Sequence, residues 1–126
     1  MKAVFVAGSR KFFQEVEDLV KELRAQGIRA ETAGKSLAAE ENLESERKEL
    51  EQAFARIDSS DVLYVFSRAG YIGKRVSLEI AYAFAKKKEI LCSEEISELS
   101  ARALVSKIVS PSELPSYLKA SKKGFF

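Results

Sequence analysis

Hydrophobic positions in this chain fall into two patterns that alternate from one end to the other. Short runs rich in apolar residues are typical of strands buried on both faces, and they occupy residues 2–7, 28–32, 61–66, 90–92 and 107–109. Between them, apolar residues recur every three or four positions, which predicts helices that begin at Phe12 and that cover 43–57, 76–85 and 96–104. Ser110, Pro111 and Glu113 form a capping pattern that predicts a final helix.

This alternation of strands and helices predicts an α/β fold. We expect residues 1–126 to form a single-domain, flavodoxin-like (Rossmannoid) three-layer sandwich, because the chain contains no repeat and no Pro/Gly-rich linker. Its five-stranded parallel sheet should have the order 2-1-3-4-5, with helices on both faces. In such a sheet ligands bind beyond the carboxyl ends of the strands, where the strand order reverses. The segments 8–13 and 67–79 are therefore the expected binding loops.

Composition and charge narrow the possible functions. Lys and Arg total 21 and Asp and Glu total 19, so the formal net charge is +2, which disfavours a nucleic-acid polymer or a polybasic membrane contact. The chain contains no His, which excludes His-based catalysis and His-ligated metals. Cys92 is the single cysteine, so no internal disulfide forms, and a reducing cytoplasm is expected. No apolar run reaches the length of a membrane span. We expect neither a metal site nor a cofactor.

Glu79 is the most informative single residue. Within 76–85 the strongly polar side chains are Ser77 and Glu79, so this carboxylate should be partly buried, which is costly without a partner. Its place near the start of a helix offsets part of that cost through the helix dipole. A partly desolvated carboxylate beside a glycine loop suits nucleophilic attack on an anomeric carbon. The alternative is a structural carboxylate bonded to loop amides or to Arg68 or Arg75.

The segment after the first strand is a second candidate site. Gly8, Ser9, Arg10 and Lys11 combine free amides at a helix start, a hydroxyl and two cations, all suited to an anionic group. The segment is neither a dinucleotide loop nor a P-loop, because it lacks the second glycine and the GK[ST] ending. An ordinary strand-to-helix turn capped by Ser9 is the alternative. Asp61, at the start of the third strand, by itself predicts a cap or turn residue.

Three strings resemble the nucleoside 2-deoxyribosyltransferase-like superfamily. GYIGKRVSLEIAYAFAKKKEI (70–90) is similar to its signature, in which a Gly-Tyr-Ile-Gly loop precedes Ser or Thr, then Glu-Ile and an Ala-rich helix ending in Lys. VFVAGSRKFFQEVEDLVKELRAQGIRAE (4–31) and ARIDSSDVLYVF (55–66) are similar to its opening and to its third strand. The resemblance implies a flavodoxin-like fold and a Glu that attacks C1′ of a deoxynucleoside to form a glycosyl-enzyme. The matched Glu is Glu79, and the implied substrate-binding residues are Gly8, Ser9, Arg10, Phe13, Asp61, Gly70, Tyr71, Gly73 and Ser77.

The sequence also departs from the superfamily pattern. The transferases place an acidic residue in the loop ahead of the nucleophile, whereas this loop carries Arg68, Lys74 and Arg75, which disfavours base exchange. The 2′-deoxynucleoside 5′-phosphate N-hydrolases grip phosphate with Gly-Ser and a nearby Arg. Arg10 is similar but stands one position closer to the Ser, and Ser77 matches their loop serine only loosely.

These features lead to two function hypotheses. The first is an N-glycosidase or deoxyribosyltransferase that acts on a small nucleoside or nucleotide through a covalent glycosyl-Glu intermediate. The second is a non-catalytic nucleotide-binding module on the same fold, since fold does not fix function. A flavin-binding domain is disfavoured because no aromatic-rich loop stands out. An open pocket facing Glu79 favours the first hypothesis, and an ion pair that locks Glu79 favours the second.

A homodimer or larger homo-oligomer is also expected. The sequence ends in Phe125 and Phe126, which have little reason to remain in water unless they pack against something, although a frayed tail is the alternative. The 76–85 helix is apolar nearly all round, which exceeds what one small domain needs to cover. The superfamily that the chain resembles is oligomeric and often shares its active sites between subunits.

Overall fold

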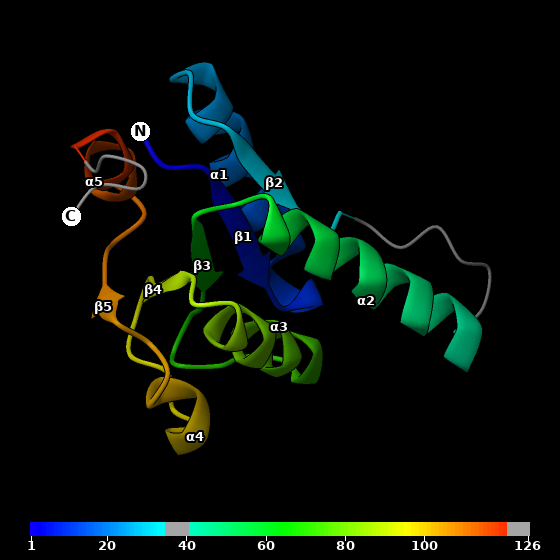
Figure 1. The fold of residues 1–126 in the computed structure, drawn as a ribbon. Coiled ribbons are helices and arrows are strands. Elements are labelled where there is room, and N and C mark those ends of the chain that lie inside the picture. Colours follow the sequence, from blue (N-terminus) through cyan, green and yellow to red (C-terminus); the bar gives the residue numbers. More distant parts are fainter. Residues whose placement is uncertain (35–40, 121–126) are drawn as a thin grey trace.

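The computed structural model describes residues 1–34 and 41–120, which form a five-stranded parallel sheet with the order β2-β1-β3-β4-β5 (Figure 1). This is the α/β, flavodoxin-like architecture and the strand order that the sequence predicts. All four neighbouring strand pairs are parallel. The strands are β1 Val4–Gly8, β2 Ala30–Thr32, β3 Val62–Phe66, β4 Glu89–Cys92 and β5 Lys107–Ile108.

Helices cover both faces of the sheet, and each face has its own hydrophobic core. On one face, side chains of α1 and α5 pack against Val4 and Val6 of β1. On the other, side chains of α2, α3 and α4 pack against Phe5 and Ala7, the alternate residues of the same strand. The helices are the 3-10 helix η1 Arg10–Phe12, α1 Phe13–Ala25, α2 Leu43–Asp58, α3 Lys74–Ala85, α4 Leu99–Arg102 and α5 Leu114–Ala120.

The junction between β1 and α1 depends on the glycine at position 8. A Cβ at Gly8 would lie 2.6 Å from Val16 Cγ2, so a larger residue would push α1 away from the strand. Because Gly8 allows the close approach, η1 and α1 begin directly at the carboxyl end of β1. This arrangement brings the backbone of Gly8 and Ser9 to the edge of the sheet where ligands bind in this architecture.

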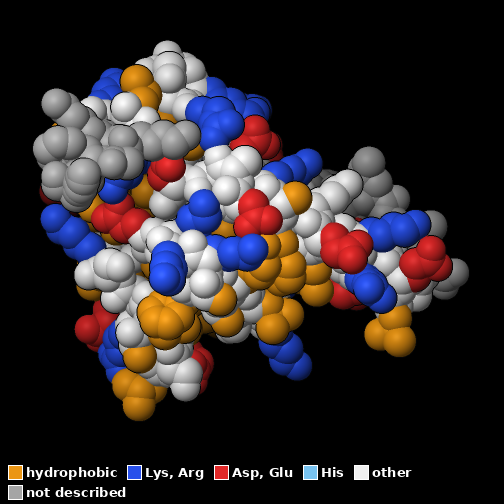
Figure 2. All heavy atoms as spheres, viewed as in Figure 1, with side chains coloured by type: hydrophobic (Ala, Val, Ile, Leu, Met, Phe, Trp, Pro, Cys, Tyr) orange, Lys and Arg blue, Asp and Glu red, His pale blue; other side chains and the backbone are white. Residues whose placement is uncertain are grey.

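Several details differ from the sequence predictions. The first strand covers Val4–Gly8 rather than 2–7, the 96–104 helix is reduced to Leu99–Arg102, and α3 begins two residues earlier, at Lys74. Part of the apolar surface of α3 is left uncovered, because Leu78 is 51% exposed and Phe84 is 56% exposed. Figure 2 shows hydrophobic side chains gathered over α3 and the neighbouring side of α2. Phe125, Phe126 and the loop residue Lys35 lie outside the described residues.

Within residues 1–34 and 41–120, no helix is both long enough and apolar enough to span a membrane. The same part of the chain contains no group of three or more acidic or Cys side chains arranged to hold a metal ion.

Candidate active site

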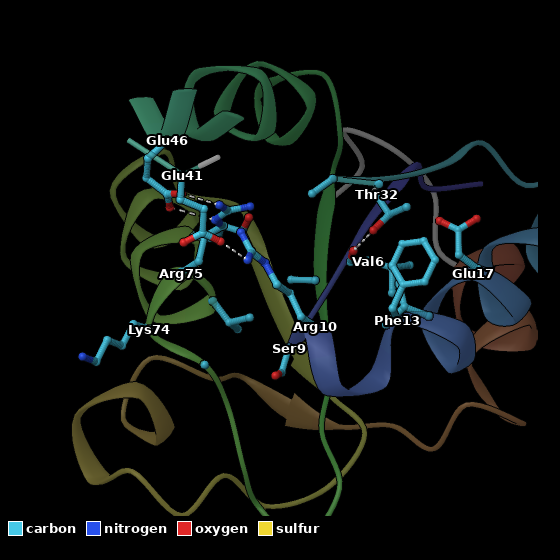
Figure 3. A pocket seen from close by; sticks show the side chains of 18 of the residues that line it. Val6, Ser9, Arg10, Phe13, Glu17, Thr32, Glu41, Glu46, Lys74 and Arg75 are labelled. Carbon is cyan, nitrogen blue, oxygen red and sulfur yellow. Dashed lines mark hydrogen bonds and ion pairs between the residues drawn. The ribbon is translucent and has the colours of Figure 1, made fainter. Parts of the chain in front are cut away.

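A cavity of about 1140 Å³ opens beyond the carboxyl ends of β1 and β2, between the first turns of α1, α2 and α3 (Figure 3). Seven of the ten sequence-predicted site residues line it, although they come from distant parts of the chain. They are Gly8, Ser9, Arg10, Phe13, Tyr71, Gly73 and Glu79. The structure therefore brings the two predicted binding loops to one site.

Glu79 reaches this cavity from a buried position. It occupies the sheet-facing side of α3 with Val76, Ile80 and Ala83 and is 3% exposed. Among the described residues the Glu79 carboxylate makes no hydrogen bond or ion pair. Every fully enclosed side-chain nitrogen or oxygen atom in that part of the chain has a hydrogen-bond partner, so the Glu79 oxygens are not fully enclosed. Because Glu79 lines the cavity, its oxygens reach the open space there. Burial raises the pKa of Glu79 to about 7, and the nearby charge of Arg75 opposes part of this rise.

Arg75 lies one helical turn before Glu79 and is held by two carboxylates of α2. Its Nη2 lies 2.6 Å from Glu46 Oε1 and 3.1 Å from Glu49 Oε1, and its Nε donates to Glu46 Oε2 at 3.1 Å. This fork-to-fork geometry is the strongest form of Arg–carboxylate contact. The guanidinium is therefore directed to α2 and is not bonded to Glu79. The alternative in which Arg75 holds Glu79 in an ion pair is not what the structure shows.

Arg10 and Glu41 form a second ion pair on the same side of the cavity. Arg10 Nη1 lies 2.5 Å from Glu41 Oε1, and both side chains are mostly exposed. Ser9 caps η1, since its Oγ accepts a hydrogen bond from the Lys11 amide at 3.2 Å. Figure 3 shows Arg10 and Arg75 both directed toward Glu41 and Glu46. The predicted phosphate ligand Arg10 thus has a carboxylate as its partner.

The opposite side of the cavity is aromatic and carries one further carboxylate. Phe13 and Glu17 project from successive turns of α1, and Figure 3 shows both lying near Thr32, away from the arginines. Glu17 is half-buried and makes no hydrogen bond or ion pair with other described residues. Tyr71 also lines the cavity, and its ring packs edge-on against Phe12 with Lys11 Nζ 4.2 Å from its centroid.

The loop between β3 and α3 is fixed by its own hydrogen bonds. Ala69 and Gly70 have φ values of 55° and 77°, and they form a tight turn between Arg68 and Tyr71. The Gly70 carbonyl accepts from the Ser97 amide at 3.0 Å, and the Ala69 amide donates to Glu94 at 2.9 Å. A Cβ on Gly70 would lie 2.2 Å from Ser97 Oγ. Gly70 therefore has a conformational role, which keeps Tyr71 and Gly73 at the cavity.

Three predicted site residues do not line the main cavity. Gly70 and Ser77 instead face an adjoining hollow of about 280 Å³, which they share with Tyr71 and Gly73. Asp61 lies at the amino end of β3, where its Oδ2 accepts from the Ala3 amide at 2.8 Å. Asp61 therefore ties the segment before β1 to the start of β3, and it lies at the opposite edge of the sheet from the cavity.

Sequence reasoning missed several residues that line the cavity. They are Glu17 on α1, Thr32, Ala33 and Gly34 after β2, and Glu41, Asn42, Leu43 and Glu46 at the start of α2. Glu17 could have been found, because it lies one helical turn after Phe13. The α2 residues carry no local signal, since only the packing of α2 against α3 brings them to the site.

The chain matches no model of a known protein family and no curated protein sequence. Solved structures with the same fold include the following three. A conserved protein from Enterococcus faecalis V583 is 18% identical, with a TM-score of 0.65 over 95% of this chain and 98% of that one. The 2-deoxyribosyltransferase of the psychrotolerant bacterium Bacillus psychrosaccharolyticus is 12% identical, with a TM-score of 0.66 over 91% and 92%. The Clostridium botulinum CMP N-glycosidase BcmB is 19% identical, with a TM-score of 0.57 over 93% and 98%.

These likenesses show that the chain has the fold of proteins of the nucleoside 2-deoxyribosyltransferase type. The fold that the sequence motifs imply is therefore confirmed. Two of these three structural neighbours are named for chemistry at an N-glycosidic bond, one as a transferase and one as a glycosidase.

Proposed function

We propose that this protein cleaves the N-glycosidic bond of a small nucleoside or nucleotide, with Glu79 as the nucleophile. The observation that carries the proposal is a buried carboxylate that has no partner among the described residues and that borders a large cavity. A folded protein does not bury such a group without a cost, and active sites are where this cost is commonly retained. The fold shared with a deoxyribosyltransferase and a CMP N-glycosidase adds support.

The reaction follows from the chemistry of a carboxylate at an anomeric carbon. An oxygen of Glu79 attacks C1′ and forms a glycosyl ester, while the C1′–N bond breaks and the base leaves with its electron pair and gains a proton. Water, or a second base in a transferase, then attacks C1′ and releases the Glu79 carboxylate. Because burial raises the pKa of Glu79 to about 7, the reactive ionised form grows as the pH rises through neutrality.

The cavity walls suit the parts of a nucleotide. The rings of Phe13 and Tyr71 offer surfaces on which a flat base can stack. Ser9 and Arg10, at the start of η1, offer backbone amides and a guanidinium to an anionic group. A phosphate at this point would displace Glu41 from Arg10, so the existing ion pair lowers the net gain from binding it.

The alternative function is a nucleotide-binding module without catalysis. An ion pair locking Glu79 would favour it, but within the described residues Arg75 is bonded to Glu46 and Glu49 instead. We therefore favour the enzyme.

The test is a screen for free base. The purified protein is incubated with deoxynucleosides, ribonucleosides and their 5′-monophosphates, alone and with a second base, and the released base is measured by chromatography. We expect release from at least one member of the panel, and a loss of at least ~10³-fold, on the order of 4 kcal/mol, in Glu79→Gln. Glu22→Gln, on the exposed side of α1, is the matched control and should retain full activity. Turnover in Glu79→Gln above a tenth of the wild-type rate would refute the assignment.

We also propose that the protein forms a homodimer or a larger homo-oligomer. Leu78 and Phe84 on α3, together with Tyr71 at the cavity, leave large apolar side chains exposed in a single copy. Covering this surface with a second copy would remove it from water and would set the contact beside the cavity.

A further inference from the structure

The Glu46–Arg75–Glu49 cluster joins α2 to α3 one helical turn from Glu79. We propose that this cluster controls the charge of Glu79, with Arg75 as a positioning residue whose effect is set by the two carboxylates of α2. The catalytic consequence of the inference rests on the proposed function. The electrostatic coupling itself does not, because it can be measured on a protein that shows no turnover.

The geometry places the cluster where it can act on Glu79. Arg75 and Glu79 are four residues apart on α3, so their side chains emerge from the same side of the helix. Arg75, Glu46 and Glu79 all line the cavity. The side chains of Arg75 and Glu49 are only 21% and 25% exposed, so solvent screens their charges less than those of surface pairs.

The two carboxylates weaken the influence of Arg75 on Glu79. One guanidinium is shared between two carboxylates, so most of its positive charge is neutralised before it can act on the buried Glu79. Arg75 favours the ionised form of Glu79, and the contacts of Glu46 and Glu49 with Arg75 weaken that effect by neutralising its charge. Burial remains the larger influence, and the pKa of Glu79 stays at about 7 despite the nearby cation.

Other charged groups face the same cavity, and the test must hold them constant. They are Arg10 of η1, Glu17 of α1, Glu41 before α2, and Lys74 at the start of α3. None of them is bonded to Glu79 among the described residues, and none changes in the variants proposed below. Differences between variants therefore report the cluster alone.

Removing the cation and removing a carboxylate from the cluster should shift the pKa of Glu79 in opposite directions. Glu46→Gln removes a negative charge and releases part of Arg75, so the pKa of Glu79 should fall. Arg75→Gln removes the cation and leaves two carboxylates, so the pKa of Glu79 should rise. Each shift should be on the order of half a pH unit, because a charge near a buried carboxyl group in a poorly screened site moves its pKa measurably. A role limited to holding α2 against α3 would not produce shifts of opposite sign.

The experiment is a titration of Glu79 by NMR on protein labelled with ¹³C at the Glu carboxyl groups. Glu79→Gln identifies the signal, because that signal alone should disappear. The midpoint is then compared in wild type, Glu46→Gln and Arg75→Gln, with Glu51→Gln as the matched control. Glu51 lies on the same helix but pairs with Arg47 at 3.4 Å, away from Arg75, so this control should leave the midpoint unchanged.

Two further variants keep the test decisive. If Arg75→Gln does not fold, Arg75→Lys keeps the charge and should leave the midpoint close to that of wild type while Glu46→Gln still lowers it, and a Glu46→Gln midpoint equal to that of wild type would then overturn the inference. Where both single variants fold, the combined Glu46→Gln and Arg75→Gln variant should show that Glu46→Gln lowers the midpoint less once the cation is gone. Midpoints that do not move, or that move in the same direction in Glu46→Gln and Arg75→Gln, would overturn the inference. Absence of turnover in wild type would instead count against the proposed function.

Discussion

Replacing Glu79 with Gln should stabilise the folded protein relative to wild type, and this gain in stability should be larger at alkaline pH than at acidic pH. The Glu79 side chain is 3% exposed, and burial raises its pKa from 4.5 to about 7. The proton is therefore held more tightly in the folded state than in the unfolded state. The stability that protonated Glu79 contributes is fully present below pH 4.5 and is lost as the pH rises through about 7.

The size of the effect follows from the difference between the two pKa values. A difference of about 2.5 between 4.5 and about 7 corresponds to roughly 3 kcal/mol at 1.36 kcal/mol per unit. Near pH 4 the protonated Glu and the Gln are both neutral and of similar shape, so the two proteins should differ little for reasons of charge. Near pH 9 wild type buries a charge that Glu79→Gln does not. The pH-dependent part of the stability difference should therefore approach about 3 kcal/mol.

The assay is urea denaturation of both proteins near pH 4 and near pH 9, followed by circular dichroism. Comparing the two pH values removes the fixed cost of burying an amide, which is present at both. Glu22→Gln serves as the control and should show no such pH dependence, because Glu22 is exposed. An equal stability difference between wild type and Glu79→Gln at both pH values would refute the reasoning, since it would mean that the carboxylate is not desolvated.

Three other predictions test separate features. In urea denaturation, Gly70→Ala should lower the free energy of unfolding by roughly 1–3 kcal/mol more than Gly27→Ala does. Both positions have a positive φ, but only at Gly70 would the added Cβ press on Ser97. Arg10→Ala should remove most of any preference for monophosphates over nucleosides, and calorimetry that finds equal affinity for both ligand forms in wild type would contradict this role. Leu78→Glu should shift an oligomer toward monomers in light scattering, whereas a wild-type mass near 14.0 kDa at micromolar concentration would end the oligomer proposal.

The sheet and the burial of Glu79 could both be predicted from local patterns. Continuous apolar runs such as 62–66 are buried on both faces, which only the inner strands of a parallel sheet require. The apolar residues Val76, Ile80 and Ala83 define one side of a helix, and Glu79 falls on that side by spacing alone. The topology of a parallel sheet should also have excluded Asp61 from the site. A residue that opens a parallel strand lies at the edge opposite the one where ligands bind.

The α2 side of the cavity could not be predicted. Glu46 and Glu49 belong to a helix whose exposed face is rich in charge, so nothing in the sequence separates them from Glu44 or Glu51. Their role depends on how α2 packs against α3, a tertiary contact that brings Arg75 between them. The ion pair between Arg10 and Glu41 could not be predicted either, because the two residues are 31 positions apart in the sequence.

The most direct test of the proposed chemistry is the detection of a sugar on Glu79. Wild-type protein is mixed with a nucleoside or nucleotide that it cleaves, quenched with acid before turnover is complete, digested, and analysed by mass spectrometry. The peptide that carries Glu79 should increase in mass by the glycosyl group, and the same peptide from Glu79→Gln should not. Base release that proceeds without any such adduct, at a rate that Glu79→Gln retains, would contradict Glu79 as the nucleophile.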